Sequence, residues 1–209
     1  MVIVFFNWKG DILLIEDNVD IYQWFDKQDK LFDVWITDPP YPFDSQNGTN
    51  RYKDMYLKFT WNDLKNIFDK MYSMTNDGGR AYVFCNRDGI QNTIDLLQNS
   101  GFRFLNLLIW DKLAFGGGYH WRNQAEFIIY VSKNKPKVEV KSVSNIFKYK
   151  RTYKKDNHPE INYMPAGKNS AKPYYIWRDI LIHGVLSNEY VADPFSGTNP
   201  MRAAYLLEQ

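Results

Sequence analysis

Short apolar runs alternate along the chain with segments whose apolar residues recur at helical spacing. The runs have the length and composition of buried strands, and they cover 33–37, 81–85, 104–110, 126–131 and 189–192. Helical periodicity is found at 61–74, 90–97 and 176–181, and a last helix is expected from Pro200 to about Leu207. This alternation predicts a single α/β domain with a twisted, mostly parallel sheet and helices on both faces.

Local signals predict where several of these helices begin and end. Thr60 and Asp63 have the spacing of a capping box, and the turn Asp77–Gly79 is expected to end the helix that they start. Asp88 is expected to cap the next helix, and Gly101 to lie at its C-terminal end.

Two of the expected strands end in the same way, with an aspartate and a proline that open a turn. The first turn is Asp38-Pro39-Pro40-Tyr41, and the second is Asp193-Pro194-Phe195-Ser196-Gly197-Thr198-Asn199. In open parallel sheets, ligands bind beyond the carboxyl ends of the strands. We therefore expect the two turns to line one shared cleft.

The first turn has the chemistry to hold an amino group. Prolines lack an N–H and stiffen the backbone, so Pro39 and Pro40 leave a nearby carbonyl fixed and without a partner in the chain. The Asp38 carboxylate and such a carbonyl form a pair of acceptors that suits the two N–H donors of an NH2 group. Tyr41 offers a flat face on which a base could stack. The alternative is a surface turn between strand and loop.

The second turn is less specific on its own. Gly197 permits close approach of a ligand to the backbone, and the helix that follows offers free N–H groups to a carboxylate. An ordinary strand-to-helix turn with a capping residue has the same pattern.

Composition narrows the class of protein only slightly. The 209 residues carry a net charge of +2, and the single cysteine, Cys85, excludes an internal disulfide. No apolar run is long enough to span a membrane, and the first residues lack the features of a signal peptide, so a cytoplasmic protein is expected, or one of the host cytoplasm if viral. His120, His158 and His183 have no ligand spacing, so no metal is expected.

Charge is unevenly distributed along the chain. The segment 133–172 contains eleven Lys and Arg against three acids, which gives it +8 and leaves −6 on the rest. Aromatic residues interleave with these charges, namely Phe147, Tyr149, Tyr153 and Tyr163. Such a pattern favours contact with nucleic acid, through phosphates and stacked bases. A solvated insertion whose lysines face water is the alternative.

Three segments are therefore candidates for DNA contact. The loop after the first turn contains Arg51 and Lys53, and the glycine-rich loop near residue 118 contains His120, Trp121 and Arg122. The basic segment contributes Lys148, Lys150, Arg151, Lys154 and Lys155.

Taken in order, these motifs resemble the amino methyltransferases of DNA, in the permuted beta class whose catalytic motif precedes the cofactor motif. Asp38–Tyr41 resembles the catalytic tetrad, and Asp193–Thr198 resembles the cofactor motif. Lys172-Pro173 and Gly10-Asp11 stand where the family has Lys-Pro and Gly-Asp, and 108–112 and 126–133 resemble two later strand motifs. The resemblance implies a Rossmann-like methyltransferase domain over 1–209, with 133–172 as a basic target-recognition insertion.

The resemblance also implies the reaction and its components. The enzyme would use S-adenosyl-L-methionine to methylate an exocyclic amine of a base flipped out of double-stranded DNA. Asp38, Pro39, Pro40 and Tyr41 would be catalytic. The cofactor would be held by Asp11, Asp38, Lys172, Pro173, Asp193, Pro194, Phe195, Ser196, Gly197, Thr198 and Asn199. Aspartate at the first tetrad position favours adenine N6 over cytosine N4, and a homodimer is possible because dimers occur in this class.

Two departures from the family pattern lead to a further expectation. Thr198-Asn199-Pro200 replaces the usual glycine-containing continuation, and the sequence ends where the family has another strand whose terminal acid binds the cofactor ribose. We expect the apolar segment Met1–Asn7 to take the place of that strand in the sheet. Three alternatives remain open: methylation of cytosine N4, a methyltransferase for RNA or protein, and a DNA-binding module that has lost catalysis.

Overall fold

The computed structural model describes residues 3–10, 13–16, 20–42, 59–117, 119–138, 142–151, 172–197 and 200–208. The strands are β1 (Ile3–Asn7), β2 (Leu13–Glu16), β3 (Phe32–Thr37), β4 (Thr75–Cys85), β5 (Arg103–Asp111), β6 (Ala125–Ser132), β7 (Ile146–Lys148) and β8 (Tyr190–Asp193). The helices are α1 (Ile21–Lys27), α2 (Trp61–Ser73), α3 (Ile90–Asn99), α4 (Tyr174–Gly184) and α5 (Pro200–Leu207), with a short 3-10 turn at Arg87–Gly89.

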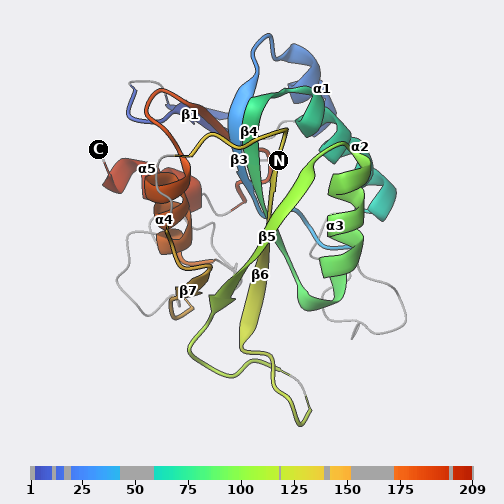
Figure 1. Ribbon diagram of the computed structural model, residues 1–209, viewed down its shortest axis with the longest axis vertical. Helices are drawn as coiled ribbons and strands as arrows, with labels where there is room; N and C mark the ends of the chain where they lie inside the picture. Colours follow the sequence, from blue (N-terminus) through green and yellow to red (C-terminus); the bar gives the residue numbers. More distant parts are fainter. Residues whose placement is uncertain are drawn as a thin grey trace.

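Within these described residues the strands form one eight-stranded sheet in the order β2-β1-β8-β3-β4-β6-β5-β7. Apolar residues alternate between its two faces. One face packs against α1, α2 and α3 through residues such as Trp35, Val83 and Leu64, and the other packs against α4 and α5 through residues such as Phe84 and Trp177. The single α/β domain with helices on both faces is thus confirmed (Figure 1).

The direction of the strands is more mixed than the sequence indicated. β3 runs parallel to β4 and β8, and β7 runs parallel to β5, but β1, β2 and β6 are antiparallel to their neighbours. β5 and β6 are joined by a loop without a helix, and such a direct connection produces an antiparallel pair. The parallel pairs that the sequence led us to expect are therefore found at the centre of the sheet and between β5 and β7, and the other pairs are antiparallel.

The N-terminal segment enters the sheet as expected. Residues Ile3–Asn7 form β1, which pairs with β8 in the register Val4 with Asp193 and Asn7 with Tyr190. The pairing is antiparallel, so the start of β1, and not its end, lies beside Asp193. β1 thus takes the place beside β8 that was expected for the missing strand. It does not end in an acid beside Asp193, as that strand does in the family that the sequence resembles.

Two of the predicted helix ends are wrong. α2 begins with the expected capping box of Thr60 and Asp63 but ends at Ser73, because residues around Gly78 pair with the backbone of Lys133 and continue β4. Asp88 does not cap the next helix: the Asn86 side chain accepts the Gly89 N–H.

Candidate active site

The two aspartate-proline turns lie side by side where the carboxyl ends of β3 and β8 leave the sheet. β3 and β8 are adjacent and parallel, with Val34 opposite Val191 and Trp35 opposite Ala192. Both strands therefore end at the same edge, and the Thr37 hydroxyl donates a hydrogen bond of 2.9 Å to Asp193 Oδ1. The two turns therefore lie beside each other, as the sequence led us to expect, and a cleft lined by both of them stays a prediction.

The first turn holds a carboxylate whose two oxygens both have donors. The Tyr41 hydroxyl donates to Asp38 Oδ1 at 2.6 Å, and the Lys172 ammonium contacts Asp38 Oδ2. Lys172 Nζ also lies 3.3 Å from the Tyr41 oxygen and 5.5 Å from the centroid of the Tyr41 ring. Burial and the neighbouring Asp38 charge raise the pKa of Tyr41 well above its usual range, so Tyr41 remains a neutral hydrogen-bond donor.

Lys172 precedes α4 in the chain, and its side chain contacts two residues of the tetrad, Asp38 and Tyr41. Its side chain is only 9% exposed, and Pro173, the N-cap of α4, is buried beside it. Proline fixes the backbone at this position (φ −64°) and directs the chain into the helix, which begins at Tyr174. Contact of Lys172 and Pro173 with a cofactor remains a prediction.

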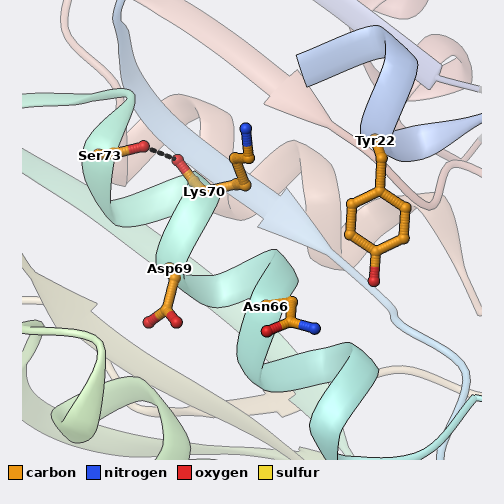
Figure 2. Close-up of a pocket in the computed structure, with 5 residues that line it drawn as sticks. All are labelled: Tyr22, Asn66, Asp69, Lys70 and Ser73. Carbon is orange, nitrogen blue, oxygen red and sulfur yellow. Dashed lines mark hydrogen bonds between the residues drawn. The ribbon is translucent and has the colours of Figure 1, made fainter. Parts of the chain in front are cut away.

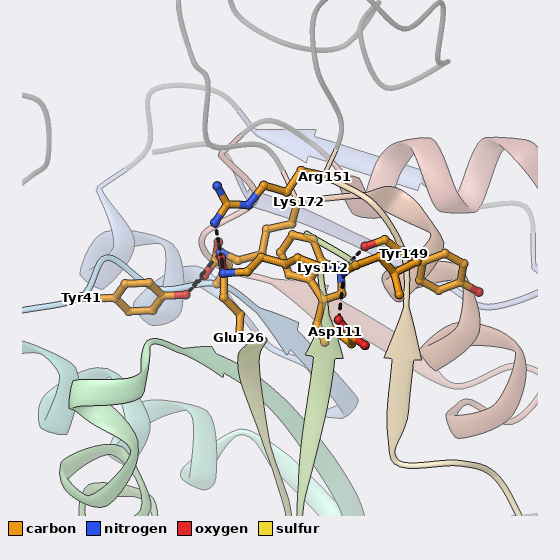
Figure 3. A network of polar contacts seen from close by, with 10 residues as sticks. Tyr41, Asp111, Lys112, Glu126, Tyr149, Arg151 and Lys172 are labelled. Atoms are coloured by element: carbon orange, nitrogen blue, oxygen red, sulfur yellow. Dashed lines mark hydrogen bonds and ion pairs between the residues drawn. The ribbon is translucent and has the colours of Figure 1, made fainter. Parts of the chain in front are cut away.

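A second carboxylate, that of Glu126, lies close to Lys172, and reasoning from the sequence missed it. Its Oε1 lies 3.4 Å from Lys112 Nζ and 3.8 Å from Arg151 Nη2, and its Oε2 lies 3.8 Å from Lys172 Nζ (Figure 3). Glu126 is the second residue of β6 and lies opposite Trp110 of β5, and Lys112 directly follows β5. Lys112 is buried, which lowers its pKa.

The second turn contains buried polar atoms that lack a partner in the described part of the chain. Asp193 is fully buried; its Oδ1 accepts from Thr37 and from the Phe195 N–H, whereas its Oδ2 and the Ser196 hydroxyl have no hydrogen bond within the described residues. Burial raises the pKa of Asp193 to about 7, although the two hydrogen bonds oppose the shift.

Backbone shape at the second turn leaves room for a ligand. Gly197 has a φ of +50°, in the left-handed region that favours glycine, and among the described residues a Cβ there would meet only the Phe195 carbonyl, at 3.5 Å. Pro194 and Phe195 are buried beside it. Three predicted cofactor residues, Asp11, Thr198 and Asn199, lie outside the described residues.

The loop between β5 and β6 projects from the sheet and exposes several large side chains (Figure 1). Tyr119 is 97% exposed, Trp121 84% and Phe115 69%, and His120 lies edge-on to Trp121. The Arg122 guanidinium donates to the Gly116 carbonyl and lies over the Phe115 ring. His120, Trp121 and Arg122 are therefore accessible to a large partner.

The basic segment is partly built into the domain. β7 pairs with β5 at the edge of the sheet, and Lys148, Lys150 and Arg151 are exposed. Two of its aromatic residues have other roles than the stacking suggested by the sequence: Phe147 is buried in the core, and Tyr149 stacks on Tyr175 and donates to Asp179. Arg51, Lys53, Lys154, Lys155, Tyr153 and Tyr163 lie outside the described residues.

Other candidate features lie away from this cluster. A shallow hollow between α1 and α2 is lined by Tyr22, Asn66, Asp69, Lys70 and Ser73, none of which belongs to either turn (Figure 2). In the described part of the chain no three His, Cys, Asp or Glu side chains gather in a metal-binding arrangement. No described helix combines the length and the apolar character needed to cross a membrane.

Comparison with known proteins identifies what this arrangement resembles. A family model described as DNA methylase matches residues 32–208. A solved structure, that of the M1.HpyAVI–SAM complex, is similar with a TM-score of 0.59 and 19% identity over 88% of this chain and 81% of that one. The structure of M1.HpyAVI gives 0.56 and 19% over 89% and 83%. No curated protein matches the chain.

Proposed function

Since the chain belongs to the N6/N4 DNA methylase family, we propose that it methylates the exocyclic N6 of adenine in a specific double-stranded DNA sequence, with S-adenosylmethionine as the methyl donor. The observation that carries this proposal is the adjacency of the two turns, because Thr37 and Asp193 join the strand ends that precede Asp38 and Gly197. The first turn has hydrogen-bond acceptors for an amine, and the second has the backbone shape and the buried polar atoms to hold the methyl donor.

The residues of the second turn fit the cofactor. Asp193 Oδ2 and the Ser196 hydroxyl are buried polar atoms that lack a partner within the described residues, and such atoms cost free energy unless a ligand pairs with them. Gly197 leaves the approach open. We infer that Asp193, Ser196 and Gly197 hold S-adenosylmethionine, together with Asp11, Lys172, Thr198, Asn199 and the remaining residues predicted above. One of the similar structures, that of M1.HpyAVI, is a complex with SAM, which supports this assignment.

The first turn orients the target base. The Asp38 carboxylate and the Pro39 carbonyl accept the two N–H bonds of the amine, and Tyr41 stacks against the flipped base. This arrangement directs the nitrogen lone pair towards the second turn. When bound, S-adenosylmethionine would supply an electrophilic methyl group to the amine nitrogen, with the electron pair of the broken C–S bond left on sulfur and one amine proton passed to solvent water.

Asp38 supports adenine as the target, because aspartate at this tetrad position is typical of N6 methylation in the enzymes that the sequence resembles. DNA would be held by the exposed residues His120, Trp121 and Arg122 and by the basic residues Lys148, Lys150 and Arg151, with Arg51, Lys53, Lys154 and Lys155 as further candidates. Phosphate contacts would position the enzyme, and base contacts would select the sequence.

Transfer of a labelled methyl group tests the proposal. The protein is incubated with labelled S-adenosylmethionine and genomic DNA from a methylation-free host, and the DNA is then digested to nucleosides and separated. We expect label in N6-methyladenine, and we expect Asp38→Ala to lose at least about 100-fold in rate because an essential transition-state contact is removed. Asp26→Ala, which changes an exposed aspartate of α1, serves as the matched control and should keep wild-type activity.

The outcomes separate the parts of the proposal. Label in N4-methylcytosine would show that the reaction class is right and the base wrong. No incorporation by the wild-type protein, or full activity in Asp38→Ala, would refute the proposed function.

A further inference from the structure

The catalytic carboxylate proposed above is already occupied in this structure. Tyr41 donates to one oxygen of Asp38 and Lys172 contacts the other. Lys172 Nζ also lies near the face of the Tyr41 ring, where a flipped base would stack. Each carboxylate oxygen can accept a second hydrogen bond, so Asp38 keeps acceptor sites for an incoming amine, but the Lys172 ammonium offsets the carboxylate charge and lies where the base would stack.

Lys172 has a second anion within reach, and this distinguishes it from Tyr41. Glu126 Oε2 lies 3.8 Å from Lys172 Nζ, about 1 Å beyond the length of a charge-assisted hydrogen bond. The other oxygen of Glu126 faces Lys112 and Arg151, so Oε2 is the oxygen directed at Lys172. A small rotation of the lysine side chain would exchange one carboxylate for the other.

We propose that Lys172 moves between two carboxylates: it caps Asp38 before the target amine enters, and it shifts to Glu126 when the amine takes its place. This inference rests on the proposed function. Glu126 is a positioning residue in this scheme, since it acts on Asp38 through Lys172, which is also one of the residues inferred to hold the cofactor. The ammonium is largely buried, and a buried charge that loses its partner is strongly destabilised, so the exchange depends on the second anion.

The exchange has a consequence for the reaction. While Lys172 caps Asp38, the two charges offset each other. Once Lys172 pairs with Glu126, the negative charge of Asp38 faces the amine, on which positive charge develops as the new C–N bond forms. The same movement clears the carboxylate and strengthens its electrostatic effect.

A double-mutant cycle tests this scheme. Methyl transfer to unmethylated genomic DNA is measured at saturating S-adenosylmethionine for Glu126→Gln, Lys172→Met and the double variant, with the cofactor Kd of each variant determined by calorimetry. We expect Glu126→Gln to lower kcat by about 10- to 100-fold, because the variant removes the anion that draws Lys172 away from Asp38. Lys172→Met in that background should restore at least about tenfold, because no ammonium is left to cap Asp38.

Two further variants separate this role from a structural one. Glu126→Asp keeps a carboxylate and should keep most of the activity, whereas Glu208→Gln changes an exposed ion pair with Arg178 and should match the wild type. Thermal unfolding of each variant shows whether the fold is intact. A double variant no more active than Glu126→Gln, or wild-type turnover in Glu126→Gln, would overturn the exchange while leaving the proposed function standing. A wild-type protein that transfers no methyl group would instead refute the proposed function.

Discussion

The Asp193 carboxylate should favour cofactor binding but lower the folding stability of the protein. The variant Asp193→Asn tests both effects. The native pKa of Asp193, about 7, compares with an ordinary value of 3.8, so above about pH 7 the buried charge costs about 4 kcal/mol of folding free energy. Asparagine has the same shape, and its carbonyl can accept from Thr37 and Phe195 as Oδ1 does. Its amide group would replace Oδ2, and an unpaired amide costs about 2 kcal/mol. We therefore expect a net gain of about 2 kcal/mol at about pH 8.

The sign of the pH dependence follows from the raised pKa. Between about pH 4 and pH 7 the native protein holds a proton that the unfolded chain has lost, so native stability decreases as the pH rises through this range. Above about pH 7 both states are ionised and the loss is complete. At about pH 5.5 the cost is only about 2 kcal/mol, which the unpaired amide of the variant offsets. The advantage of Asp193→Asn should therefore disappear on acidification.

Thermal unfolding at these two pH values is the assay. A gain of about 2 kcal/mol corresponds to a rise in Tm of about 4–8 °C for a domain of this size. Calorimetry should show cofactor binding weakened at least about tenfold in Asp193→Asn, because the carboxylate is no longer available to the ligand. Asp26→Asn, at an exposed ion pair, should change neither property. The reasoning is refuted if Asp193→Asn is no more stable than wild type at about pH 8, or if its advantage is the same at both pH values.

Two further predictions concern DNA binding and the core. Replacing Lys148 and Lys150 with glutamine should reduce the slope of log Kobs against log salt by about 2, because two phosphate contacts are lost; an unchanged slope would mean that these lysines face water. Glu189→Gln should lower the free energy of unfolding by about 3 kcal/mol in denaturant titrations, because Arg80 is fully buried and pairs with Glu189. A loss below about 1 kcal/mol would show that Arg80 does not depend on this partner.

Local patterns were sufficient to predict the two turns. Asp38–Tyr41 and Asp193–Gly197 each occupy a few consecutive residues, and parallel strands bring their carboxyl ends to one edge. The strands and helices around the turns could be predicted from hydrophobic periodicity, which is likewise a property of short stretches of sequence. The two helix ends that were predicted wrongly, at Asp77–Gly79 and Asp88, depended on which partners the backbone groups found.

The cluster around Glu126 could not be predicted in this way. Lys112 and Glu126 meet because β5 and β6 pair antiparallel, and Arg151 joins them because β7 adds to the edge of β5. None of these residues is near Asp38 in sequence, and each alone resembles an ordinary charged residue at a strand end. The glycine-rich connection between β5 and β6, whose sequence has no helical periodicity, was the available signal for the antiparallel pair.

The central claim is that a single pocket holds the amine at Asp38 and the methyl donor at Gly197. A bisubstrate compound, in which the N6 of adenosine is joined through a short linker to the sulfur end of an S-adenosylmethionine analogue, tests it most directly. We predict by calorimetry that this compound binds at least about tenfold tighter than S-adenosylhomocysteine, and that Asp38→Ala removes this advantage over S-adenosylhomocysteine. Equal binding of the two compounds to the wild-type protein, or an advantage that persists in Asp38→Ala, would contradict the account.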